Sequence, residues 1–145
     1  MHLDNKNLSL FLADDDLDYR TLFLEALDRL GIRAQIRTFD NGVDLMADLL
    51  DLNTDLPDIL YLDLNMPLMT GEECLYDIRN EQTLAEIPIV IYSGYYDDRN
   101  IEMLREKGAD RFLQKPTSFT ALQELIERSI LSIIKPTENE PFLIK

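Results

Sequence analysis

The sequence is short of cysteine and of basic residues. Cys74 is the single cysteine, which excludes an internal disulfide framework and a cysteine-rich metal site and suits a reducing cytosol. Lysine and arginine number 14 against 28 acidic residues, for a net charge of −14. A surface this acidic repels nucleic acid phosphates, so we expect no direct binding to nucleic acid. It remains compatible with basic partners and with local Mg²⁺ sites.

Long apolar runs are also missing. No stretch approaches the roughly 20 residues that cross a bilayer, and the N-terminus lacks the apolar core of a signal peptide. We therefore expect no membrane partner and a cytoplasmic location. No repeat, low-complexity tract or interdomain linker interrupts the 145 residues, of which 46% are apolar. This composition predicts one domain over residues 1–135, followed by a tail over residues 136–145.

What the sequence contains is a regular alternation of apolar runs and amphipathic stretches. We predict strands over 8–13, 34–39, 58–62, 89–92 and 111–114. We predict helices over 18–30, from the Asn41-Gly42 turn through 50, and over 71–79, 98–107 and 117–135, with Thr117 or Ser118 capping the last. Five such units predict an α/β fold with a parallel sheet covered on both faces. The first, third and fourth strands, which have the fewest polar residues, should be central.

Polar residues gather where these strands end. Asp14, Asp15 and Asp16 follow the first strand, Asp63 follows the third, and Ser93 and Lys115 lie at the ends of the fourth and fifth. A doubly wound sheet places its functional site beyond the carboxyl ends of its strands, so these side chains should share one edge. Bringing buried carboxylates together is costly unless a cation neutralises them.

This set of side chains suits phosphoryl transfer. Asp63 is a potential nucleophile, because a carboxylate can attack phosphorus and form an aspartyl phosphate. Asp14 and Asp15 could hold Mg²⁺, which prefers one or two carboxylates with several waters and a phosphate oxygen. Lys115 offers a positive charge and Ser93 a hydroxyl donor for phosphoryl oxygens.

The chain resembles the receiver domain of two-component response regulators over about residues 8–134. The resemblance rests on Asp14-Asp15, Arg20, Asp63 with Asn65-Met66-Pro67 and Gly71, Ser93-Gly94, and Lys115-Pro116, each at its expected place along the chain. It implies a flavodoxin-like, doubly wound sheet of five parallel strands in the order 2-1-3-4-5, with five helices on both faces. It also implies a cis bond between Lys115 and Pro116.

The resemblance implies a phosphorylation site at the carboxyl ends of the strands. Asp63 would accept a phosphoryl group from a phosphohistidine on a sensor histidine kinase or a histidine phosphotransfer protein. Together with Asp63, Asp15 would ligate Mg²⁺ directly, Asp14 partly through water, and Asn65 through its backbone carbonyl.

The resemblance also implies a conformational switch. Ser93 and Lys115 would bond the phosphoryl oxygens, and Phe112 would swing inward as Ser93 moves toward the phosphate. Tyr95 is large enough to shield the phosphoryl group from water. The chain would then be a stand-alone receiver that catalyses only its own phosphorylation and dephosphorylation, and signals through a downstream protein or a phosphorelay.

Several alternatives stay open. A one-residue slip would make Asp15-Asp16 the acidic pair, although the spacing to Arg20 favours Asp14-Asp15. A receiver-like interaction module could act without phosphorylation. A haloacid-dehalogenase-like phosphatase needs an acid where Asn65 stands, and a flavodoxin-like electron carrier needs a first loop that does not repel phosphate.

The last helix leaves a further choice. Leu122, Ile126, Ile130 and Ile133 form a core stripe that Ile134 widens, while Leu131 projects nearly opposite it. Either the Phe142-Leu143-Ile144 segment covers this apolar helix end, or a partner or a second copy does, as in a homodimer through the last helices.

Overall fold

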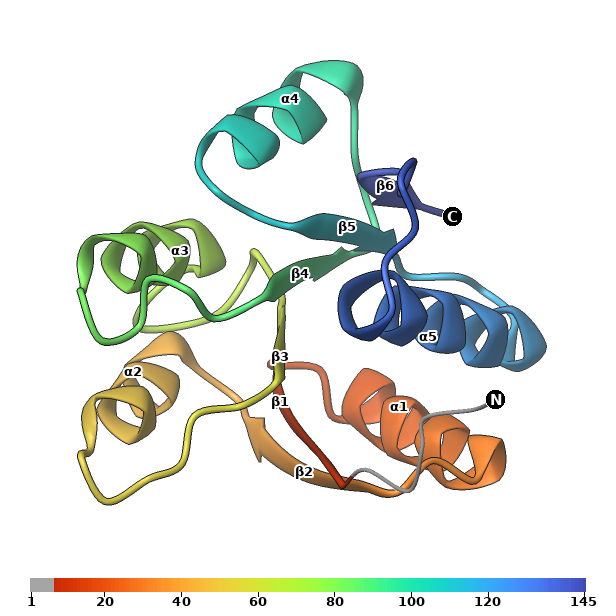
Figure 1. Ribbon diagram of the computed structural model, residues 1–145, viewed down its shortest axis with the longest axis horizontal. Coiled ribbons are helices and arrows are strands. Elements are labelled where there is room, and N and C mark those ends of the chain that lie inside the picture. Colours follow the sequence, from red (N-terminus) through yellow and green to blue (C-terminus); the bar gives the residue numbers. More distant parts are fainter. Residues whose placement is uncertain (1–6) are drawn as a thin grey trace.

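The computed structural model describes residues 7–145, and its strands form a single parallel sheet (Figure 1). The strands are β1 (Leu8–Ala13), β2 (Ala34–Phe39), β3 (Ile59–Leu62), β4 (Ile89–Ser93), β5 (Arg111–Gln114) and β6 (Leu143–Ile144). Their order is β2-β1-β3-β4-β5-β6. The predicted doubly wound fold and strand order are therefore confirmed, and a sixth strand extends the sheet beyond β5.

Within residues 7–145, five helices cover the sheet on both faces. Helices α1 (Leu17–Leu30) and α5 (Phe119–Ile134) pack on one face, and α2 (Gly42–Leu50), α3 (Gly71–Asn80) and α4 (Asp98–Glu106) pack on the other (Figure 1). Within the described residues, no helix is long and apolar enough to span a bilayer. The limits of β1, β2 and β5 are as predicted, and those of the other predicted elements differ by at most two residues. Helix α5, for example, begins at Phe119 because the Ser118 side chain caps it.

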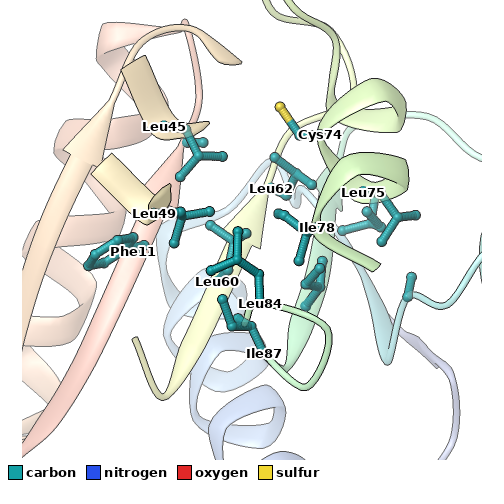
Figure 2. Packing of buried hydrophobic residues seen from close by; sticks show 14 of the residues in the cluster. Phe11, Leu45, Leu49, Leu60, Leu62, Cys74, Leu75, Ile78, Leu84 and Ile87 are labelled. Carbon is teal, nitrogen blue, oxygen red and sulfur yellow. The ribbon is translucent and has the colours of Figure 1, made fainter. Parts of the chain in front are cut away.

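Alternate residues of the central strands fill two separate cores. Leu60 and Leu62 of β3 face α2 and α3 in the core drawn in Figure 2, whereas Tyr61 faces α1 and α5. Nearly every residue of β1, β3 and β4 is buried, as expected for strands covered on both faces. These strands are central, as predicted, and their packing fixes the register in which they end.

Two local features depart from the sequence prediction. Strand β6 was not predicted, because two residues of a ten-residue tail carry no periodic signal. The tail covers the apolar end of α5: Ile144 packs against the core of α1 and α5, and Phe142 against the other core.

The described residues contain no cis peptide bond, so the expected cis bond at Lys115–Pro116 is wrong. An X–Pro bond prefers trans by only about 0.5–1 kcal/mol, so the sequence alone does not fix its isomer.

The loop after β3 wraps closely around Gly71, the first residue of α3. A Cβ atom at this position would collide with the backbone carbonyl oxygen of Asp63 and lie 2.8 Å from Cα of Leu64. We expect Gly71→Ala to lower the free energy of unfolding by about 1–3 kcal/mol, because neither backbone atom can move freely. Gly94→Ala is the control, since nothing lies within 4 Å of the added methyl, and it should change stability by less than about 0.5 kcal/mol. Equal midpoints in urea for the two variants would contradict this packing.

Candidate functional site

The ends of four neighbouring strands place the predicted site residues at one edge of the sheet. The parallel hydrogen-bond ladder continues past the strands: the backbone N–H of Asp63 donates to Ala13 at 2.9 Å, and that of Lys115 donates to Ser93 at 2.8 Å. Asp14 is held in the same way by the carbonyl of Phe39 at 2.9 Å. Backbone pairing, and not only side-chain packing, therefore sets where these groups lie.

Lys115 lies between two buried carboxylates. Its Nζ is 2.8 Å from Oδ2 of Asp14 and 3.4 Å from Oδ2 of Asp63. The Asp14 side chain is fully buried, and those of Lys115 and Asp63 are each only 7% exposed. Water screens such a group of charges weakly, so each charge depends on the others for its stabilisation.

Asp14, Asp15 and Asp63 form a cluster with the composition of a divalent metal site. One carboxylate oxygen from each residue lies within 4.8 Å of the other two. Oδ1 of Asp14 accepts a hydrogen bond from the backbone N–H of Asp16 at 2.9 Å. Oδ2 is buried and accepts no hydrogen bond of good geometry from the residues that the structure describes, although Lys115 is within ion-pair distance. A buried acceptor among carboxylate oxygens suits a hard divalent cation, which takes oxygen ligands.

The electrostatics of the cluster favour the arrival of positive charge. Burial raises the pKa of Asp63 to about 6; Lys115 opposes this rise and Asp14 adds to it. Burial acts to lower the pKa of Lys115, but its contacts with Asp14 and Asp63 outweigh burial and raise that pKa above its ordinary value. The lysine therefore stays charged, and one positive charge faces two buried carboxylates and the exposed Asp15.

The acidic pair that lies with Asp63 at the sheet edge is Asp14-Asp15 and not Asp15-Asp16. Asp16 caps α1, and its Oδ1 accepts hydrogen bonds from the backbone N–H groups of Asp18 and Tyr19 at 2.9 and 3.3 Å. Arg20 donates from Nη1 to the backbone carbonyl of Asp14 at 2.6 Å. The third aspartate is thus used in helix capping, while the first two face the sheet edge with Asp63.

Ser93, Phe112 and Asn65 are uncharged and stand outside the ion pairs of this cluster. The Ser93 hydroxyl is engaged in its own loop, 3.4 Å from the carbonyl oxygen of Tyr95. Phe112 is fully buried, and its ring lies 5.9 Å from that of Tyr96 in an edge-to-face arrangement. The backbone N–H of Asn65 lies 3.4 Å from Oδ1 of Asp63. The structure therefore brings together the acids and Lys115, while the roles predicted for these three residues stay predictions.

Two tyrosine rings lie against Lys115, and neither contact was predicted from the sequence. Nζ of Lys115 lies 4.4 Å from the ring centroid of Tyr19 and 5.0 Å from that of Tyr92. Aromatic faces attract an ammonium group, and the attraction is stronger where water is excluded. The available signal for Tyr92 was its polar tip directly after three aliphatic residues of β4; its buried hydroxyl has no hydrogen-bond partner among residues 7–145. Tyr19 gave no such signal, because its contact depends on how α1 packs.

Comparison with known proteins gives one consistent result. A family model described as "Response regulator receiver domain" matches residues 10–127. The chemotaxis protein CheV1 of Helicobacter pylori is 32% identical over 113 residues, which are 77% of this chain and 35% of CheV1. The chain thus spans about a third of the length of that relative.

Solved structures agree on the fold. The phosphorylated cyanobacterial phytochrome response regulator RcpA superposes with a TM-score of 0.82 at 24% identity, over 91% of this chain and 97% of RcpA. The Mn²⁺-bound form of the response regulator Rcp1 superposes with a TM-score of 0.78 at 24% identity, over 92% of this chain and 99% of Rcp1.

The pKa of Asp63 predicts a pH-dependent cost of keeping this carboxylate charged. Because the folded-state pKa, about 6, lies above the ordinary value of 3.8, the stability contributed by Asp63 is present below about pH 4 and is lost as the pH rises through 6. Without divalent ions at pH 7.5, we expect Asp63→Asn to be more stable than the wild type by about 1–3 kcal/mol.

Thermal unfolding of both proteins between pH 4 and pH 8 checks this expectation. The difference should shrink toward pH 4, and Asp55→Asn, a change at an exposed loop position, should follow the wild type throughout. If Asp63→Asn and the wild type melt at the same temperature at pH 7.5, burial does not destabilise the ionised form of Asp63 as proposed.

Proposed function

Because the chain belongs to the response regulator receiver family, we propose that Asp63 is phosphorylated in two-component signal transduction. The donor would be a phosphohistidine on a sensor histidine kinase or a histidine phosphotransfer protein. A carboxylate oxygen of Asp63 attacks phosphorus, and the phosphorus–oxygen bond forms as the bond to the imidazole nitrogen breaks. The observation that carries the proposal is the convergence of Asp14, Asp15 and Lys115 on this carboxylate.

Asp14, Asp15 and Asp63 would hold Mg²⁺, with the backbone carbonyl of Asn65 as a further ligand. In support, these donors are all oxygen, the atom type Mg²⁺ prefers, and the buried Oδ2 of Asp14 accepts no hydrogen bond of good geometry. A similar fold, that of Rcp1, was solved in a Mn²⁺-bound form. When bound, the cation would neutralise negative charge on the phosphoryl oxygens.

The remaining residues of the site would bind the phosphoryl group and change their packing in response. Lys115, already held within the site by two carboxylates and two rings, would contact one phosphoryl oxygen, and the Ser93 hydroxyl would donate to another. Movement of Ser93 would break its contact with the Tyr95 carbonyl and change the packing of Tyr96 on Phe112. One added phosphoryl group would shift the equilibrium between two packings of the same fold. A downstream protein would recognise the surface of the favoured packing.

The activity we propose is confined to the protein itself. The chain would catalyse only its own phosphorylation and dephosphorylation, because the position two residues after Asp63 is Asn65 and offers no acid for turnover of free phosphate esters. A cytoplasmic location completes this proposal. An interaction module that works without phosphorylation finds no support in the site, since no residue of the expected acceptor set is missing.

Incubation with Mg²⁺ and acetyl phosphate, followed by intact mass measurement, tests the proposal. We expect one added phosphoryl group, which does not form when EDTA is present from the start and is absent in Asp63→Asn. Asp58→Asn is the matched control, because Asp58 precedes the opposite end of the same strand, and it should be phosphorylated like the wild type. Unmodified wild-type protein, or equal labelling of Asp63→Asn, would overturn the proposal.

Tyr95 offers a test of how the phosphoryl group is protected. Tyr95 is 67% exposed, with its hydroxyl 3.3 Å from Oδ2 of Asp97, and its backbone lies beside the Ser93 hydroxyl. We expect Tyr95→Ala to change the rate of dephosphorylation severalfold by altering water access to the phosphoryl group. Tyr76→Ala removes an equally exposed ring from α3 and should leave the rate unchanged. An unaltered half-life in Tyr95→Ala would count against a shielding role.

A further inference from the structure

The position of the Lys115 ammonium is not fixed by short, well-directed hydrogen bonds to other residues in the range 7–145. Its 2.8 Å contact with Oδ2 of Asp14 lacks hydrogen-bond geometry, and its hydrogen bond to Oδ2 of Asp63 is long, at 3.4 Å. A charge-assisted bond from an ammonium to a carboxylate is ordinarily about 2.7–2.9 Å. Because the ammonium sits on a long, flexible stem, the two carboxylates alone leave its position loosely defined.

Two aromatic rings enclose this ammonium from the other side. Nζ lies 4.4 Å from the ring centroid of Tyr19, in α1, and 5.0 Å from that of Tyr92, in β4. The rings stand nearly at right angles, with an interplanar angle of 88° and centroids 6.4 Å apart, so that they form a corner. Both distances fall within the roughly 6 Å over which a ring face attracts a cation, and exclusion of water strengthens the attraction. The Lys115 side chain is almost completely buried and meets this condition.

The corner is held rigidly by the core behind it. The buried ring of Phe23 packs edge-to-face on Tyr92, with centroids 5.6 Å apart, and on Tyr61 at 4.8 Å. The Tyr61 hydroxyl in turn shares a 2.6 Å hydrogen bond with the hydroxyl of Ser129, in α5. Close-packed side chains of this kind move little, so the Tyr92 ring keeps its place when the lysine moves. The rings therefore mark one fixed position for the positive charge.

We propose that Tyr19 and Tyr92 are positioning residues that confine the Lys115 ammonium beside Asp63 for phosphoryl transfer, a role that rests on the function proposed above. As Asp63 attacks phosphorus, negative charge on the phosphoryl oxygens is stabilised best by a cation that is already in place. A ring face attracts the ammonium without accepting a directed hydrogen bond from it. The N–H groups of Lys115 therefore stay available to turn toward a phosphoryl oxygen.

Fluorination of the ring at position 92 tests this role with little change in shape. Fluorine withdraws electrons from the ring face and so weakens its attraction for a cation. The reference protein is Tyr92→Phe, which keeps the ring and removes only a hydroxyl that has no hydrogen-bond partner among residues 7–145. Phenylalanines that carry increasing numbers of fluorine atoms then replace the residue at this position. We expect the rate of phosphorylation by acetyl phosphate and Mg²⁺ to fall progressively along the series, by about fivefold or more.

Phe23 is the matched control, because its ring is buried in the same core, whereas the rings that face Lys115 among the described residues are those of Tyr19 and Tyr92. The same fluorinated residues at position 23 should leave the rate unchanged. A rate that does not vary along the series at position 92, or that falls equally at positions 23 and 92, would overturn the positioning role.

Proton NMR of Lys115 separates this proposal from the proposed function. Ring currents move the resonances of a methylene group above an aromatic face upfield, and this effect does not require phosphorylation. We expect an upfield shift of the Lys115 ε-methylene protons in the wild type and a smaller shift in Tyr19→Leu, which lacks the nearer ring.

The two proposals can then fail separately. Shifted methylene protons in a protein that acetyl phosphate does not modify would overturn phosphorylation of Asp63 and leave the confinement of Lys115 standing. Unshifted methylene protons in a wild-type protein that is phosphorylated would overturn the confinement alone. Neither result depends on a variant that lacks the buried Tyr92 ring.

Discussion

The site depends on one lysine that holds two buried carboxylates together. With Nζ 2.8 Å from Asp14 and 3.4 Å from Asp63, Lys115 offsets a repulsion that would otherwise oppose the meeting of β1, β3 and β5 at a common edge. Neutralisation is incomplete, because one lysine faces two buried carboxylates and the exposed Asp15 adds a third negative charge to the same cluster. The fold is thereby left with a place where an additional cation is favourable, and the chemistry proposed for Asp63 follows from that imbalance.

The fold could be predicted from the sequence because apolar strands and helix caps are local patterns that recur along the chain. β3 and β4 are apolar at nearly every position, as strands covered on both faces must be, and Ser118 and Gly31 mark helix ends through capping and a left-handed backbone. The acidic edge followed from topology alone, since parallel strands deliver their carboxyl ends to the same side.

What the sequence did not predict comes from contacts between distant elements. The rings of Tyr19 and Tyr92 flank Lys115 only because α1 packs beside β4 and β5, and the sequence around Tyr19 carries no signal of this contact. Strand β6 is two residues long and is stabilised by pairing with β5 and by the burial of Phe142 and Ile144, which no periodicity reveals. The trans Lys115–Pro116 bond reflects an energy difference too small for the sequence to decide.

A ¹³C NMR titration of the Asp63 carboxyl carbon, with and without Mg²⁺, measures whether this carboxylate is poised to bind a cation. Burial beside Asp14 predicts a midpoint near pH 6 in the metal-free protein, and a bound divalent cation should lower it by at least one unit, because positive charge favours the ionised form. A metal-free midpoint near the ordinary value of 3.8 that does not move with Mg²⁺ would contradict the claim that this buried carboxylate is poised for a cation.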